Sequence, residues 1–236
     1  MIISFSGLDG AGKTTQIKRV LNAYKNQGAK VGSIYSFVPD IRYHNVNELC
    51  NLYENLLFFD VIHIRFRLNS DRNNMIMQKL ESRLPKQRLV ASAAAIQGCL
   101  NHKELTKFLL KPLLNKKKIL IFDRYYYDEL VFKSVYGAPK VILEMLYQNE
   151  KDADLGFILR ITSDECVKRN CHRPDSKMSI YQSQSHIDSL INCFDCIAKR
   201  KGLITLDGAL PEERITKKVM DHIYQFNNKS CQLFFN

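Results

Sequence analysis

The chain has 236 residues, of which 45% are hydrophobic and 25% are charged, and this balance excludes an intrinsically disordered protein. Its 35 Lys and Arg against 24 Asp and Glu give a net charge of +11, which fits a nucleic acid, an anionic membrane or a phosphorylated small molecule as partner. The most apolar window, residues 56–66, is interrupted by charged residues. It falls short of the roughly 18 apolar residues that a membrane span requires, so we expect no such span. The length predicts a single domain over residues 1–236.

The first forty residues are typical of a strand, a glycine-rich loop, a helix and a second strand. Residues 1–6 and 30–37 are short apolar runs that favour buried strands. Between them Ile17, Val20 and Leu21 recur at the spacing of an amphipathic helix, which Gly28 ends. This succession predicts a parallel sheet.

The rest of the chain continues to alternate between helices and strands. After residue 40 we expect helices over residues 49–68, 75–84 and 91–110, with breaks at 69–74 and at Pro85. Strands are expected at 119–122, 154–161 and 203–206, and helices at 139–147, from Thr162, at 185–201 and at 211–226. The alternation predicts one doubly wound α/β domain with a five-stranded parallel sheet.

The seven cysteines include one C-x-x-C pair, Cys193 and Cys196. A structural zinc site needs four ligands, and no second pair lies at a suitable spacing. We therefore interpret both residues as reduced thiols one turn apart on a helix. Reduced thiols indicate a reducing, cytoplasmic setting.

The sharpest motif is GLDGAGKT at residues 7–14, which matches G-x-x-x-x-G-K-[ST]. The glycines let the backbone curl so that its N–H groups surround phosphate oxygens, and the following helix adds the positive end of its dipole. Lys13 would reach the β- and γ-phosphates, and the Thr14 hydroxyl would hold Mg²⁺. The predicted nucleotide-binding residues are Gly7, Gly10, Ala11, Gly12, Lys13, Thr14 and Thr15.

A second constellation follows the apolar run at residues 119–122. Asp123 at the end of this strand is placed to steer the Mg²⁺ shell, and Arg124 offers a planar fork for phosphate. The aromatic residues at 125–127, with Phe132, either stack on a base or pack into the core, and both interpretations stay open.

These segments together resemble the thymidylate kinase family of P-loop nucleoside monophosphate kinases. The family pattern F-E-G-x-[DE]-x-x-G-K-[ST]-[ST] is similar to residues 5–15, and the family's D-R-[YH] is similar to residues 123–125. Two later family stretches are similar to residues 154–169 and 206–213. The resemblance covers residues 1–36 and 105–226. It implies the P-loop NTPase or nucleoside monophosphate kinase fold, ATP and Mg²⁺ as cofactors, and a possible homodimer.

The resemblance also implies roles for individual residues. Asp9 would contact the sugar or the phosphate of the acceptor, and Arg124 would bind the acceptor phosphate. Because the loop has glycine at position 10, where one branch of the family has arginine, a lid over residues 168–183 should supply the cation. The predicted catalytic residues are Lys13, Arg124, Arg169 and Arg173.

The chain departs from the family on the acceptor side. Residues 36–40 lack the Arg and Glu of the family's R-E-P-G-like segment, and no arginine lies near His102, where the family has a second acceptor-binding arginine. Arg65 or Arg67 would substitute, within an acceptor-side helical region over residues 40–110, and Asp replaces the family's Ser at position 128. The predicted acceptor-binding residues are Asp9, Arg65, Arg67, Arg124, Tyr125 and Asp128, and the predicted metal ligands are Thr14 and Asp123.

Three functions fit these observations. The first is an ATP- and Mg²⁺-dependent nucleoside monophosphate kinase that forms the diphosphate. The second is a kinase that phosphorylates a hydroxyl of a nucleoside or other small molecule, which would need a carboxylate base such as Asp9, Asp40 or Asp128. The third is a nucleotide-dependent regulator or nucleic-acid-binding module, supported only by the bulk charge. We favour the first function, because the motifs of the donor side are intact, and therefore expect a triphosphate donor and a small phosphorylated acceptor, without a membrane or nucleic-acid partner.

Overall fold

The computed structural model describes residues 1–37, 46–67, most of 91–171, and 184–232; positions 93–94, 97, 101 and 104–105 are excepted. Its centre is a sheet of six strands in the order β2-β3-β4-β1-β5-β6, and every neighbouring pair is parallel. The strands are β1 Ile2–Gly7, β2 Val31–Phe37, β3 Val61–Arg67, β4 Ile119–Asp123, β5 Leu155–Arg160 and β6 Ile204–Asp207.

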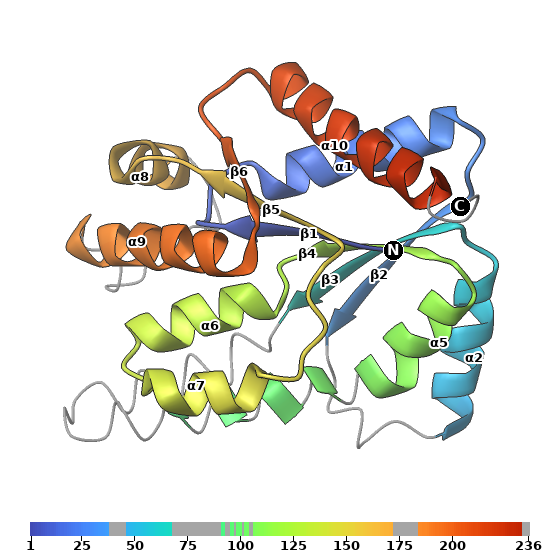
Figure 1. The fold of residues 1–236 in the computed structure, drawn as a ribbon, viewed down its shortest axis with the longest axis horizontal. Helices are drawn as coiled ribbons and strands as arrows, with labels where there is room; N and C mark the ends of the chain where they lie inside the picture. Colours follow the sequence, from blue (N-terminus) through green and yellow to red (C-terminus); the bar gives the residue numbers. More distant parts are fainter. Residues whose placement is uncertain are drawn as a thin grey trace.

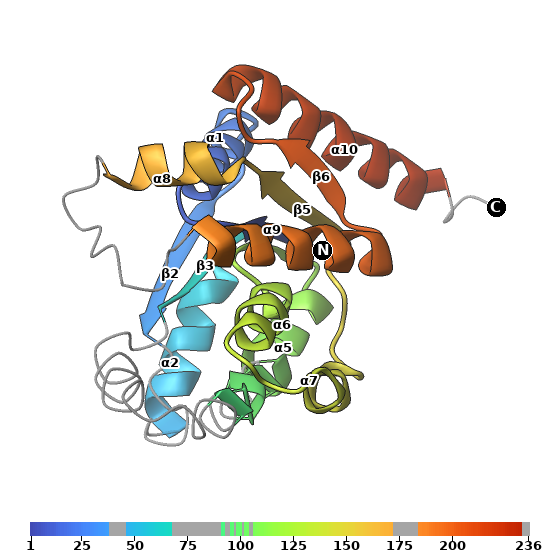
Figure 2. The same cartoon turned by 90° about the vertical axis from the view of Figure 1, so that its left-hand side faces the viewer.

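Helices cover both faces of this sheet (Figures 1 and 2). On one face lie α1 Lys13–Asn26 and α10 Glu212–Gln232. On the other face lie α6 Tyr126–Val135 and α9 Gln184–Lys201, with α7 Lys140–Tyr147 below them in Figure 1. The remaining helices are α2 Val46–Leu57, α5 Lys111–Asn115, α8 Ser163–Cys171, a π-helix at Thr106–Leu110 and the helical residues between 91 and 103.

The doubly wound α/β fold with a parallel sheet is confirmed, but the sheet has one strand more than the five expected. The helix expected over residues 49–68 is wrong in its second half, because α2 ends at Leu57 and residues 61–67 form β3. Since β3 lies between β2 and β4, Val61, Ile62 and Ile64 are completely buried. A short apolar run buried on both faces has no period that separates a strand from a helix.

The same strand corrects the expected acceptor-side helical region over residues 40–110, which is helical only in part. The predicted break at 69–74, the helix at 75–84 and Pro85 lie outside the described residues. The short helix α6 was not predicted, although it begins directly after the Asp-Arg-Tyr segment.

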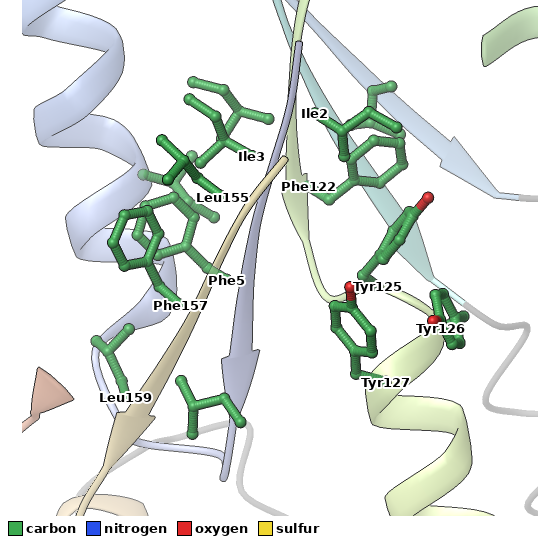
Figure 3. Packing of buried hydrophobic residues seen from close by; sticks show 14 of the residues in the cluster. Ile2, Ile3, Phe5, Phe122, Tyr125, Tyr126, Tyr127, Leu155, Phe157 and Leu159 are labelled. Carbon is green, nitrogen blue, oxygen red and sulfur yellow. The ribbon is translucent and has the colours of Figure 1, made fainter. Parts of the chain in front are cut away.

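The core lies on both sides of β1, all six residues of which are buried. On one side Ile17, Val20 and Leu21 of α1 are buried, as their helical spacing predicts. Phe5 stacks there on Phe157 of β5, with ring centroids 5.3 Å apart (Figure 3). The interior of this sheet therefore fixes the position of the loop that follows β1.

No helix in the part of the chain that the structure describes is long and apolar enough to cross a membrane. Cys193 and Cys196 lie on α9 as free thiols, as the sequence predicts.

Candidate active site

The glycine-rich segment forms a tight loop between β1 and α1, at the carboxyl edge of the sheet. Gly7 has a φ of +132°, and a Cβ atom there would lie 2.6 Å from the carbonyl oxygen of Leu159. Gly12 has a φ of +92° and caps α1, which begins with Lys13. At Gly7 only glycine combines this conformation with so close an approach of two backbones, and the positive φ of Gly12 also favours glycine. Ala11 lies within the loop, and Thr14 and Thr15 lie in the first turn of α1.

Lys13 is folded into the loop. Its Nζ donates hydrogen bonds to the carbonyl oxygens of Gly7 at 3.0 Å and Leu8 at 2.7 Å, and the residue is only 6% exposed. Burial, assisted by the neighbouring charge of Arg124, lowers the pKa of Lys13 to about 8 against the opposing effect of nearby carboxylates. The loop therefore holds a cation that a phosphate would stabilise in its charged form.

Two oxygen ligands meet beside the loop. The Thr14 hydroxyl donates to Oδ2 of Asp123 at 2.9 Å, and Asp123 is 4% exposed at the end of β4. Arg65, at the paired position of β3, places Nε 3.5 Å from the same carboxylate oxygen. A hydroxyl and a carboxylate suit Mg²⁺, which usually takes one or two protein oxygens and completes its shell with phosphate and water. The predicted ligands Thr14 and Asp123 thus fit this ion.

Arg124 lies at the centre of a charged network. Its Nη1 donates to Asp128 at 2.8 Å and to the carbonyl oxygen of Gly7 at 3.3 Å, and its Nη2 donates to Asp9 at 2.5 Å. Burial acts to lower the pKa of Arg124, but Asp9, Asp128 and Asp123 outweigh it and hold the pKa above its ordinary value. Its φ of +77° is rare outside glycine, so the network holds a strained backbone that aims the side chain at the loop.

Asp128 and Tyr125 are buried at the start of α6. Asp128 uses its second oxygen to accept the backbone N–H of Tyr125 at 3.2 Å, which satisfies a free donor of the helix N-terminus. The ring of Tyr125 packs 4.9 Å from that of Phe122, and its hydroxyl donates to the carbonyl oxygen of Lys151 at 2.9 Å. Figure 3 shows Tyr125 clustered with Tyr126 and Tyr127.

Of the two interpretations of these tyrosines, the structure favours packing. Tyr125 is 5% exposed, Tyr126 1% and Tyr127 0%, and all three hydroxyls bond to residues 151–153. Burial raises the pKa of each of the three hydroxyls above its ordinary value. Tyr125, predicted to bind the acceptor, is therefore enclosed by protein in this structure.

Arg169 approaches the loop from α8. Its Nε donates to Glu165 at 2.6 Å and its Nη1 to the carbonyl oxygen of Gly10 at 3.2 Å. The structure thus brings the predicted residues Lys13, Thr14, Asp123, Arg124 and Asp9 together with Arg65 and Arg169. Arg173 and most of the lid predicted over 168–183 lie outside the described residues, as does the side chain of Arg67.

Two further residues at this site were not predicted from the sequence. Cys166 and Asn170 of α8 donate to the carbonyl oxygen of Asp9, at 3.3 and 3.1 Å. Both are buried, and their spacing of four residues places them on one face of α8. That spacing was the available signal, but the partner lies about 160 residues away in the chain.

Comparisons with known proteins find relatives that match nearly the whole chain. The family model described as thymidylate kinase matches residues 62–219, a segment that includes Asp123, Arg124 and Arg169. A probable thymidylate kinase of Sulfurisphaera tokodaii is 23% identical over 222 residues, with 94% of each chain covered. Thymidylate kinases of Fervidobacterium nodosum and Blochmanniella pennsylvanica are 20% and 25% identical, and the matches cover 93% and 94% of this chain and 96% and 93% of those proteins. The chain therefore belongs to the thymidylate kinase family and is a nucleotide kinase, a transferase.

Proposed function

We propose that this protein transfers the γ-phosphoryl group of ATP, in a Mg²⁺-dependent reaction, to a nucleoside monophosphate and forms the diphosphate. The observation that carries the proposal is the position of Arg124. Its guanidinium lies between the loop carbonyl of Gly7 and two carboxylates, beside the Thr14–Asp123 pair. A site for a second phosphate therefore adjoins a site for a triphosphate.

On the donor side, Lys13 and the loop N–H groups would bind the β- and γ-phosphates. Thr14 and Asp123 would hold Mg²⁺, which supplies charge neutralisation between phosphate oxygens when bound. Arg169, 31% exposed on α8, is close enough to the loop to act as a lid arginine with Arg173. Phosphoryl transfer needs mainly positioning and charge neutralisation, and an arginine of this kind is worth about 10³–10⁵ in rate.

On the acceptor side, the exposed Asp9 is the partner of Arg124 that a phosphate would displace. Asp9 is 58% exposed, whereas Asp128 is 4% exposed and also caps α6. Arg65 is 37% exposed and adds a second cation at the same edge of the sheet. Two cations around an acceptor phosphate would reduce its repulsion from the incoming phosphoryl group.

The charges at the site favour a phosphate acceptor over a hydroxyl acceptor. A kinase for hydroxyl groups benefits from a carboxylate that accepts a proton. Asp9 and Asp128 each accept a hydrogen bond from Arg124, and Asp123 accepts one from Thr14, so each of these carboxylates is already engaged by a donor of the protein. Asp40, the other candidate base, lies outside the described residues. A nucleoside monophosphate already carries an anionic oxygen and needs no such base.

A coupled assay of ADP release tests the proposal. The purified chain would be mixed with Mg·ATP and, in turn, dTMP, the other nucleoside monophosphates, nucleosides and sugars. dTMP comes first because the relatives are named thymidylate kinases. We expect turnover with one or more monophosphates and its loss in Lys13→Ala. Turnover with nucleosides or sugars alone would replace the proposal with a hydroxyl kinase, and no turnover with any acceptor would refute it.

A further inference from the structure

Two buried side chains of α8, Cys166 and Asn170, hold the outer side of the phosphate loop, the glycine-rich segment at residues 7–14. Both donate to the same carbonyl oxygen, that of Asp9, and Asn170 is only 4% exposed. Asn170 also donates to the sulfur of Cys166 at 3.4 Å, so the two side chains support each other. A buried amide with its donors engaged in this way holds the carbonyl of Asp9 in one direction.

The direction of that carbonyl decides the direction of the next N–H group. The C=O of Asp9 and the N–H of Gly10 belong to one planar trans peptide unit, in which they point in opposite directions. Because the carbonyl points toward α8, the N–H of Gly10 points away from α8. In a loop of this sequence the N–H groups on the inner side surround the phosphates.

Packing against α8 also explains the residue at position 10. A Cβ atom on Gly10 would lie 3.3 Å from Cβ of Arg169 and 3.4 Å from both side-chain heteroatoms of Asn170, and the φ of Gly10 is +83°. A Cβ atom at position 10 would require α8 or the loop to shift by a few tenths of an ångström, and the positive φ would strain any residue other than glycine. The close approach that makes position 10 a glycine therefore also brings Arg169 and Asn170 to two successive carbonyls of the loop.

We propose that Asn170, assisted by Cys166, is a positioning residue that orients the loop for the polyphosphate tail of the nucleotide. The inference rests on the proposed function, because it assigns the loop to a phosphate chain. Asn170 itself does not touch the nucleotide. It acts through the peptide unit that joins Asp9 and Gly10.

Calorimetry on the full chain tests this role with two probes, Mg·ATP and Mg·tripolyphosphate. Asn170→Leu removes the donor at similar volume. We expect both affinities to fall by the same factor, about 5- to 10-fold, because one hydrogen bond that orders the loop is lost. Ser163→Ala is the control, since the Ser163 hydroxyl on the same helix contacts Gln184 and not the loop.

A second pair of variants keeps the test valid if Asn170→Leu does not fold. Cys166→Ser retains a donor and Cys166→Ala does not, so we expect weaker tripolyphosphate binding in the alanine variant than in the serine variant. Equal tripolyphosphate affinity in wild type, Asn170→Leu and Cys166→Ala would overturn the inference and leave the proposed function standing. A wild-type chain that binds neither probe would instead overturn the proposed function, and the inference with it.

Discussion

The variant Asp128→Asn distinguishes the contributions of Asp128 and Asp9, the two carboxylates that bind Arg124. The substitution keeps the volume of the side chain but removes its negative charge, and Oδ1 of that carboxylate accepts a hydrogen bond from Nη1 of Arg124 at 2.8 Å. Asp9 remains as the other partner, on a loop and 58% exposed. We therefore expect the guanidinium to lose its fixed position while the fold is retained.

The expected loss of acceptor binding follows from how far the Arg124–Asp128 ion pair is buried. Removing one partner of a fully buried ion pair costs about 3–5 kcal/mol. Here the side chain of Arg124 is 29% exposed and keeps Asp9 and the carbonyl of Gly7, so solvent screening and the remaining partners reduce the loss. We expect about 1–2 kcal/mol less acceptor binding, which corresponds to about a 5- to 30-fold rise in the Michaelis constant for the acceptor.

Steady-state kinetics with each substrate varied in turn measures this effect. The Michaelis constant for ATP should change less than about threefold, because Lys13, Thr14 and the loop are intact. Glu144→Gln is the control: it removes a surface carboxylate that accepts from Arg200 at 2.6 Å on the far helices α7 and α9. An equal rise in both Michaelis constants, or no rise for the acceptor, would refute the assignment of Asp128 as the fixed partner of Arg124.

Three further outcomes are expected. ATP affinity should fall as the pH rises above about 8, by up to about tenfold per pH unit, since the pKa of Lys13 is about 8 and phosphate binding requires its charged form. Calorimetry from pH 7 to 10 measures this fall in the wild type, and an ATP affinity that does not change with pH would contradict it. The ATP affinity of Lys13→Arg should not change over the same pH range. Arg124→Ala should weaken acceptor binding more than ATP binding, and equal losses in calorimetry would count against its role. Arg169→Ala or Arg173→Ala should lower kcat by at least about tenfold in steady-state assays, and wild-type rates for both variants would contradict the predicted role of these arginines in a lid.

Because the pKa of Lys13 is lowered in the folded chain, the free energy of unfolding should also depend on pH. The unfolded chain, with an ordinary lysine pKa of 10.5, binds more protons than the folded chain between about pH 8 and 10.5. The contribution of Lys13 to the free energy of unfolding therefore rises with pH in that window. Lys13→Met should remove this contribution in denaturant titrations at pH 8 and 10.

Sequence patterns predict the elements of the proposed donor side because these elements are local. The strand, the glycine loop and the amphipathic helix lie within residues 1–26, and each signal depends on neighbours a few positions away. The Asp-Arg pair was found for the same reason, since Asp123 directly ends an apolar strand. In contrast, the local pattern of residues 61–67 favours a helix, because their strand conformation depends on hydrogen bonds to β2 and β4.

The residues of the chain alone are enough to predict a glycine-rich loop after the first strand of a parallel α/β sheet, and an Asp and an Arg after a later core strand. Three other features depend on how distant elements pack: Asp9 binds Arg124, the tyrosines at 125–127 fill the core, and Asn170 reaches Asp9 across 161 positions of the chain. Backbone conformation and amphipathic period are properties of a few consecutive residues. The partner of a buried polar side chain is set by which elements pack together, and no local pattern carries that information.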